Sequence, residues 1–367
     1  MLGGCATPEG TARHAGARPA ARGHWRVAQG LQVASVGMGT YLGAVTPQAR
    51  DGYQRAALAY LARGNLLDTA SNYRDQASER DLGAALQRFV DQGGDRSGVV
   101  VVTKAGFLHG DADEPDAPAW FAQTFLGPGL VEERHLRMGH CLAPAFLRTQ
   151  VGRSRANLRL ETIDFLLLHN VEHPLLAGVG AAEHLQQVED AFTELEALVD
   201  AGRIGAYGVA TWGGLRVRPG VRGHLPLVRL VHHAGVARQR AGGRAGQHHF
   251  RAVELPVNLA MPEAAREATQ PWRFGEATAL QCCADQGWLT LASASLAQGR
   301  RPATQAERAR LGVEDPLLAA LQFTRSLPGV TSALVGMGQA RHAEAAMALA
   351  SSRSPDPAAA TALLPEL

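Results

Sequence analysis

The run VVVVTK at residues 99–104 is short, almost wholly apolar, and ends on a charged residue. Such a run is typical of a strand that is buried on both faces, as in a parallel sheet. Seven other runs along the chain have the same character and are also predicted to be strands. They are residues 35–39, 65–68, 163–168, 204–209, 252–257, 288–292 and 332–336.

Amphipathic segments lie between these runs and predict helices. The clearest are residues 48–63, 78–90, 145–158, 182–201, 271–286, 316–326 and 339–350. Alternation of strand and helix allows either a doubly wound sheet or a closed barrel. Eight repeats over about 320 residues favour the barrel. The predicted fold class is therefore α/β, a (β/α)8 TIM barrel with long βα loops, preceded by a β-hairpin that turns at Gln29-Gly30.

The segments outside this alternation are expected to be tails or long loops. We predict a flexible N-terminal tail over residues 1–23, the barrel over 24–351 and a C-terminal tail over 352–367. Two connections are unusually long, and loops of such length are usually lids or irregular excursions. They are residues 106–140, which include Trp120 and Phe121, and residues 212–250, which are rich in Arg and His. Both are expected to shape a pocket.

The composition argues against several classes of function. The chain has 367 residues, of which 46% are hydrophobic, enough for one large core. A net charge of +2 argues against a dedicated nucleic-acid binder. No apolar run reaches membrane-spanning length. The four cysteines form no spaced framework, which favours a reducing, cytoplasmic location.

One residue count is unusual. Of 36 Lys and Arg residues, a single one is lysine, Lys104. Arginine can take most surface roles of lysine, but it cannot replace a compact amine with a tunable pKa. The position of Lys104 is therefore informative.

Polar side chains stand at the ends of three consecutive predicted strands. Asp68, Lys104 and His169 end the second, third and fourth strands, and Tyr73 follows Asp68 by five residues. In a (β/α)8 barrel the carboxyl ends of the strands converge on one face, where active sites lie. Each residue alone has a structural explanation, since a strand-end Asp often caps a helix and a buried His is often a core residue. Together, and with the sole lysine among them, they predict a catalytic site.

Together, the four groups could donate a proton to a carbonyl oxygen. A phenol has a pKa of about 10, and a nearby ammonium lowers that pKa by stabilising phenolate. A carboxylate would hold the ammonium, and an imidazole would orient a carbonyl oxygen. The phenol could then protonate that oxygen. The sequence shows no set of metal ligands and no activated Ser or Cys, so no metal site is predicted and hydrolysis is disfavoured.

The order of these motifs resembles that of the aldo-keto reductase family. The matching segments are GMGT at 37–40, LDTASNY at 67–73 with Ser78-Glu79 behind it, VTK at 102–104 and LLH at 167–169. The resemblance extends roughly from residue 25 to residue 350. It implies a (β/α)8 barrel that binds NAD(P)H without a Rossmann fingerprint and reduces aldehydes or ketones. It also implies that Tyr73 is the acid/base, Lys104 and Asp68 tune its pKa, and His169 orients the carbonyl.

The resemblance implies cofactor contacts as well, with departures around the nicotinamide. Ala210-Thr211 stand where the family has Ser-Asn, and Glu254 stands where Gln is common. Arg341 and His342 lie where the family places contacts to a 2′-phosphate, which favours NADPH, with NADH possible. The full set of implied contacts is Gly39, Thr40, Asn170, Ala210, Thr211, Glu254, Ser293, Ser295, Leu296, Gly336, Met337, Gly338, Arg341 and His342.

Two alternatives to a small-molecule carbonyl reductase remain open. One is a nucleotide-binding regulatory protein on the same fold with little turnover, suggested by the altered nicotinamide contacts. The other is a lyase or isomerase that uses Lys104 as a Schiff base, which would not need Tyr73 beside Asp68.

Overall fold

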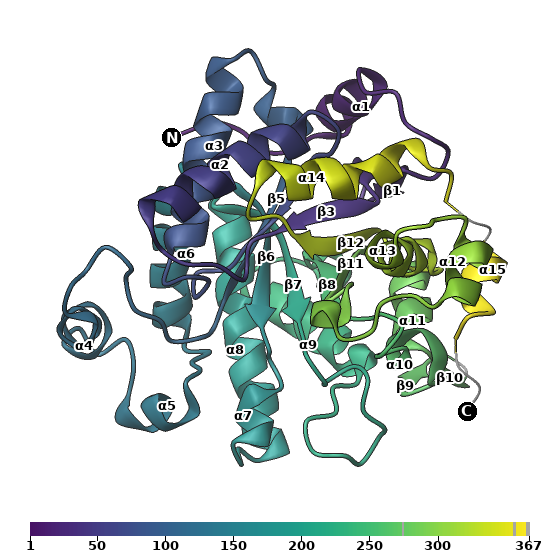
Figure 1. Cartoon of the computed structure of the whole chain (residues 1–367). Coiled ribbons are helices and arrows are strands. Elements are labelled where there is room, and N and C mark those ends of the chain that lie inside the picture. Colours follow the sequence, from purple (N-terminus) through teal and green to yellow (C-terminus); the bar gives the residue numbers. More distant parts are fainter. Residues whose placement is uncertain (274, 355–356, 365–367) are drawn as a thin grey trace.

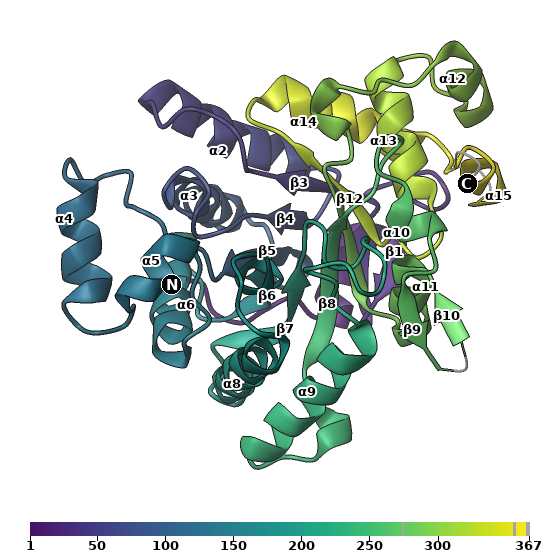
Figure 2. The same ribbon diagram turned by 90° about the horizontal axis from the view of Figure 1, so that it is seen from below.

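Eight parallel strands close into a barrel in the computed structural model, which describes residues 1–273, 275–354 and 357–364. The strand order around the barrel is β11-β12-β3-β4-β5-β6-β7-β8 (Figures 1 and 2). The predicted (β/α)8 barrel is thus confirmed, and each of the eight predicted runs supplies one strand. The strands are β3 (Val36–Gly39), β4 (Leu66–Asp68), β5 (Val100–Ala105), β6 (Ile163–His169), β7 (Ile204–Ala210), β8 (Phe250–Pro256), β11 (Leu289–Ser293) and β12 (Ser332–Gly336).

Helices surround the barrel and bury its outer face. Several begin where the sequence offers a side-chain cap followed by proline, as at Thr46 and Asp315. No helix of the described residues is both long enough and apolar enough to cross a membrane. The main helices are α2 (Pro47–Leu61), α3 (Ala77–Asp91), α6 (Pro144–Leu158), α8 (Ala181–Asp200), α9 (Leu227–Arg240), α11 (Ala279–Gln286), α13 (Pro316–Ser326) and α14 (Ala340–Met347).

The predicted hairpin covers one end of the barrel. Strands β1 (Trp25–Ala28) and β2 (Leu31–Ala34) pair antiparallel. Leu31 and Val33 belong to the same apolar cluster as residues that fill the barrel interior, among them Leu66 and Val102. The hairpin thus fills the end of the barrel at which the strands begin.

The predicted N-terminal tail contains an ordered helix. Helix α1 (Pro8–Gly16) begins at a Thr7 cap and packs against the turn η1 (Arg96–Gly98). The approach is so close that a Cβ on Gly10 would lie 2.2 Å from Ser97 Oγ. Small residues make this packing, so it leaves no apolar period in the sequence. In the predicted C-terminal tail, α15 (Pro357–Thr361) is helical, and residues 355, 356 and 365–367 lie outside the described part.

The prediction of an irregular excursion over residues 212–250 is wrong for its second half. Helix α9 occupies residues 227–240 and packs against α8. The segment has no acidic residue of its own, and acidic residues of α8 balance its charge. Arg238 pairs with Asp200 at 2.7 Å and Arg240 with Glu189 at 2.9 Å. The partners of these cations are distant in sequence, so local composition did not show them. The turn η3 (Ala245–Gln247) then leads into β8.

The single helix predicted over residues 271–286 is also wrong in its first half. A small hairpin, β9 (Gln270–Trp272) and β10 (Gly275–Ala277), comes first. Helix α11 then begins after Thr278, whose side chain accepts from the Gln281 amide in a capping box. That cap sets the helix boundary, and the amphipathic pattern alone did not resolve it.

The long connection after β5 contains short helices. They are α4 (Ala117–Phe121), the π-helical turn η2 (Ala122–Leu126) and α5 (Glu133–Met138), and α4 stands outside the ring of helices in Figures 1 and 2. The other short elements are α7 (His173–Leu176), α10 (Glu263–Arg266), η4 (Ala297–Gly299), α12 (Gln305–Leu311) and η5 (Ala348–Ser351).

Candidate active site

Lys104 lies at the centre of the predicted catalytic group. It is fully buried near the end of β5, next to β4, which ends at Asp68. Its ammonium donates to Asp68 Oδ1 at 2.5 Å and to the Thr69 carbonyl at 3.1 Å. A buried ion pair with this geometry holds the ammonium in one position.

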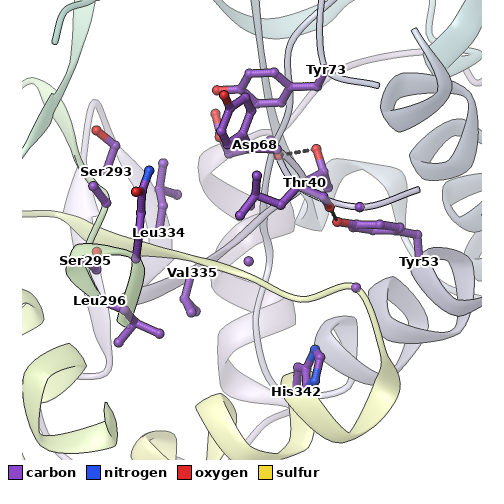
Figure 3. Close-up of a pocket in the computed structure, with 18 of the residues that line it drawn as sticks. Thr40, Tyr53, Asp68, Tyr73, Ser293, Ser295, Leu296, Leu334, Val335 and His342 are labelled. Carbon is purple, nitrogen blue, oxygen red and sulfur yellow. Dashed lines mark hydrogen bonds between the residues drawn. The ribbon is translucent and has the colours of Figure 1, made fainter. Parts of the chain in front are cut away.

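Tyr73, in the loop after β4, lies beside Asp68 at the cavity (Figure 3). The centroid of its ring lies 5.1 Å from Lys104 Nζ and 5.7 Å from the ring of His169, the last residue of β6. The structure therefore brings Asp68, Tyr73, Lys104 and His169 together, as the spacing of the motifs predicts.

The loop that follows Tyr73 is conformationally strained. Arg74, Asp75 and Gln76 have φ values of 51°, 47° and 72°, although none is glycine. A left-handed conformation of this kind costs about 1–3 kcal/mol per residue and persists only where contacts enforce it. Here Arg74 pairs with buried Asp81 at 2.8 Å, and the Gln76 side chain donates to the Gly110 carbonyl at 3.0 Å. These contacts fix the backbone beside Tyr73.

Glu254, predicted as a cofactor contact, lines the cavity and also lies against Lys104. It lies on β8 with only 5% of its surface exposed, and its Oε2 is 3.1 Å from Lys104 Nζ. The same ammonium pairs with Asp68 at 2.5 Å. One ammonium therefore faces two buried carboxyl groups. The sequence located Glu254 on its strand but gave no sign of which side chain it meets inside the barrel.

Burial and charge act in opposite directions on these groups. Burial raises the pKa of Asp68 and of Glu254, and repulsion from Asp68 raises the pKa of Glu254 further. Burial alone would lower the pKa of Lys104, but the two carboxyl groups more than offset it, so the amine stays charged. For Tyr73, burial raises the pKa and outweighs the opposite effect of Lys104. The ammonium thus acts in the predicted direction, while the net shift of Tyr73 is upward.

His169 is held as a neutral imidazole. Burial, and then the charge of Lys104, hold its pKa well below the usual value. The ring of Phe107 packs edge-on against it at 5.0 Å between centroids. Its Nδ1 has no hydrogen-bond partner among the described residues. A neutral imidazole that lines the cavity can donate one hydrogen bond to an incoming oxygen.

A cavity of about 1520 Å³ opens over these residues. It runs from Asp68, Tyr73 and His169 to the loop after β11 and the start of α14 (Figure 3). Lys104 is covered by its partners and does not line it. The predicted contacts that do line it are Gly39, Thr40, Asn170, Ala210, Thr211, Glu254, Ser293, Ser295, Leu296, Gly336, Gly338, Arg341 and His342. Met337 is the exception, because its side chain is fully buried in the core.

Several residues that line the cavity were not predicted. They include Tyr41, Leu42, Phe107 and Trp212. The ring of Tyr41 packs on Tyr73 and the ring of Phe107 on His169, each at 5.0 Å between centroids. Trp120, which the sequence analysis placed at the pocket, is not among the described lining residues, and neither is Phe121. Both pack on Phe125 instead, at 5.6 Å and 5.2 Å between ring centroids. Apolar residues two positions after a strand end, such as Phe107 after β5, would have predicted the cavity lining better.

The cavity has features that fit an extended dinucleotide. Asn72 Oδ1 and Thr211 Oγ1 are buried on its wall with no hydrogen-bond partner among the described residues. Gln339 precedes α14 without a side-chain cap, so the first two amides of this helix are free at the cavity. Arg341 stands beside them. Polar atoms without partners, free helix amides and a cation suit an amide at one end of the cavity and phosphate at the other.

Comparison with known proteins agrees with this architecture. The family model described as "Aldo/keto reductase family" matches residues 35–218. No curated protein sequence matches the chain. Similar solved structures include an aldo/keto reductase from Klebsiella pneumoniae in complex with NADP and acetate, which is 17% identical with a TM-score of 0.59 and covers 95% of this chain and 97% of that one.

Two further structures show the same fold. The holo form of an aldo-keto reductase from Bacillus halodurans is 17% identical with a TM-score of 0.59, covering 93% of this chain and 96% of that one. Glycerol dehydrogenase from Gluconobacter oxydans is 18% identical with a TM-score of 0.61, covering 93% and 94%. Identities this low show the fold alone, whereas the family model spans half of the sequence. On that match, the chain belongs to the aldo/keto reductase family.

Proposed function

We propose that the protein is an NADPH-dependent reductase of aldehydes or ketones. The observation that carries the proposal is the contact of Tyr73 with a buried Lys104–Asp68 ion pair at the floor of a large cavity. A nicotinamide dinucleotide bound in this cavity would supply a hydride. The structures from Klebsiella pneumoniae that contain NADP or NADPH have the same fold and support this choice of cofactor.

Each of the four catalytic candidates has its own role in the reduction. The neutral imidazole of His169 donates a hydrogen bond to the substrate carbonyl oxygen and orients it. The carbonyl carbon accepts the hydride, the C=O π bond breaks, and the oxygen takes the proton of Tyr73 Oη. Lys104 stabilises the phenolate that is left, and Asp68 holds Lys104 in place. The carbonyl is reduced by two electrons, and one proton leaves the phenol.

The mouth of the cavity favours uncharged substrates with an apolar body. Tyr41, Leu42 and Trp212 line it and are 58%, 65% and 49% exposed. Among the described lining residues, the arginines are Arg55 on α2 and Arg341 on α14, away from the Tyr73 end. A substrate carboxylate near Tyr73 would therefore find no arginine there to pair with.

The test follows NADPH oxidation in the presence of a panel of aldehydes and ketones. We expect turnover with the parent protein and a loss of at least about hundredfold in Tyr73→Phe, because this change removes the transferred proton. Lys104→Met is expected to lose a comparable factor. Undiminished turnover in Tyr73→Phe would refute the proposed acid. Within the panel, neutral aromatic aldehydes should have a lower KM than carboxylate-bearing analogues of the same size.

The second candidate is a nucleotide-binding regulatory protein with little turnover. Ala210 and Glu254 at the nicotinamide end favour it, since neither matches the family's usual residue there. Tight NADPH binding without turnover on any carbonyl would support this alternative. The Schiff-base alternative is disfavoured because a nucleophilic amine must be neutral, while the carboxyl groups beside Lys104 raise its pKa.

A further inference from the structure

Glu254 is a buried acidic residue to which the reduction described above gives no role. It lines the cavity and lies 3.1 Å from Lys104 Nζ, the same ammonium that pairs with Asp68 at 2.5 Å. By strand register its neighbours are Ala210 on β7 and Leu291 on β11, neither of which carries a charge. The titratable groups that face it are Asp68 on β4, Lys104 on β5 and Tyr73 in the loop after β4.

Charge balance in this cluster requires a proton. Two ionised carboxylates beside one ammonium would leave a net negative charge in a site where Asp68 is 3% exposed and Glu254 5%. Two buried carboxyl groups that face one ammonium repel each other if both are ionised, so one of them is expected to hold a proton.

The distances to Lys104 indicate which carboxyl group holds the proton. Asp68 accepts a direct hydrogen bond from Lys104 at 2.5 Å, which favours its ionised form. Glu254 Oε2 is farther from the ammonium, at 3.1 Å, and has no hydrogen-bonding partner among the described residues. Asp68 is therefore the carboxylate and Glu254 the carboxylic acid.

We propose that Glu254 is a protonated positioning residue that keeps Tyr73 competent as an acid, and that its ionisation slows carbonyl reduction. The inference rests on the proposed reductase function. A neutral Glu254 leaves the charge of Lys104 free to stabilise the Tyr73 phenolate as the proton leaves. An ionised Glu254 adds a negative charge beside that phenolate and weakens the effect of Lys104.

The direction of the pH dependence follows from these charges. Burial and the neighbouring Asp68 raise the pKa of Glu254, so its proton is lost well above the pKa of about 4.3 of an ordinary glutamate. Reduction should therefore be supported at lower pH and decline as Glu254 ionises. One added charge a few ångströms away in a partly buried site is worth about tenfold or more in rate.

The first arm of the test needs no substrate. The infrared C=O stretch of a protonated carboxylic acid is recorded for the full-length parent and for Glu254→Gln over a series from about pH 6 to about pH 10. We expect a band at neutral pH that is absent in Glu254→Gln and that fades in the parent as pH rises. Glu276→Gln, the same change at an exposed position on β10, is the control and should keep the band. Absence of the difference band at neutral pH would overturn the proposal.

The second arm measures carbonyl reduction by the same three proteins over the same pH series. Each profile is normalised to its own maximum, so a general loss of activity does not matter. We expect a decline of about tenfold in the parent and in Glu276→Gln that is missing from Glu254→Gln. Identical normalised profiles would overturn the proposal. A band without turnover on any carbonyl would refute the proposed function while supporting the proton on Glu254.

Discussion

At the scale of single residues, Lys104 has the most constrained surroundings in the site. Its ammonium is enclosed by Asp68, the Thr69 carbonyl and Glu254, and no part of the side chain reaches solvent. The chain uses arginine everywhere else, yet keeps an amine here. A planar guanidinium is larger and would have to displace at least one of these partners.

Lys104→Arg is therefore expected to be nearly inactive although the charge is conserved. We expect a loss of at least about hundredfold in kcat/KM for carbonyl reduction, or roughly 2.7 kcal/mol of transition-state stabilisation. Circular dichroism and NADPH titration show whether the variant folds and binds cofactor. Lys104→Met, of similar length and without charge, serves as the comparison should Lys104→Arg fold poorly. Activity close to the parent in Lys104→Arg would contradict the proposed role.

Three of the four catalytic candidates could be predicted from sequence because they stand at or beside strand ends, and Tyr73 follows one of them by five residues. A strand end is visible in the sequence, and parallel strands bring their ends to one face. The contact of Glu254 with Lys104 was not predictable, because it crosses the barrel interior between β8 and β5. Spacing along the chain shows which end of a strand a residue occupies, but not which distant side chain it meets.

At the scale of elements, Glu196 connects α8, β7 and the segment before β8. Its fully buried carboxylate accepts from Tyr207 Oη at 2.9 Å and from the His249 amide at 2.7 Å. Its second oxygen lies 2.6 Å from His249 Nδ1 and 3.5 Å from Arg238 on α9. One acidic residue of α8 thus organises a region with no carboxylates of its own.

Glu196→Gln is expected to lower the free energy of unfolding by about 1–3 kcal/mol at neutral pH, because buried donors lose their charged acceptor. Burial raises the pKa of Glu196, but the hydrogen bonds from His249 and Tyr207 outweigh this and lower it overall. A lowered pKa gives stability that is present above the unfolded-state value of about 4.3 and lost as pH falls through the folded-state value. The difference between parent and variant should therefore shrink in acid.

Urea denaturation at about pH 7 and about pH 4 measures both effects. Glu183→Gln, in the first turn of the same helix, is the matched control, since the Glu183 side chain is 57% exposed. That control should change stability by no more than about 0.5 kcal/mol. Equal destabilisation by the two variants would contradict the role of Glu196.

The strands were more predictable than the helices for a physical reason. A strand in a closed parallel barrel is apolar on both faces, so its run of residues is recognisable alone. Helix α9 depends on acidic residues of α8 for its charge balance, and α11 depends on the Thr278 cap for its start. The ion pairs between α9 and α8 join residues that are far apart in sequence, so no short stretch of sequence reveals them. Helix α1 was missed because small residues can pack without an apolar stripe.

At the scale of the whole molecule, the hairpin fills one end of the barrel and the cavity occupies the other. The cavity joins the Tyr73 end to α14, which leaves room for a dinucleotide with its nicotinamide beside Tyr73 and its adenosine side at α14. Arg341 and His342 lie on the exposed start of α14 at the edge of the cavity. Arginine can bind a phosphate dianion with two parallel hydrogen bonds, so this end would recognise a 2′-phosphate.

Cofactor preference should therefore depend on Arg341. We expect Arg341→Ala to raise the Kd for NADPH by about tenfold, or 1.4 kcal/mol, and to leave the Kd for NADH nearly unchanged. Because a ligand that binds only the folded state stabilises the whole molecule, the Tm increase caused by a fixed concentration of NADPH should become smaller in the variant. The increase caused by NADH should not. Arg310→Ala, at an exposed position on α12 outside the cavity lining, is the control. An equal loss for both cofactors would show that Arg341 contacts a part they share, such as the pyrophosphate, and would remove the structural basis for preferring NADPH.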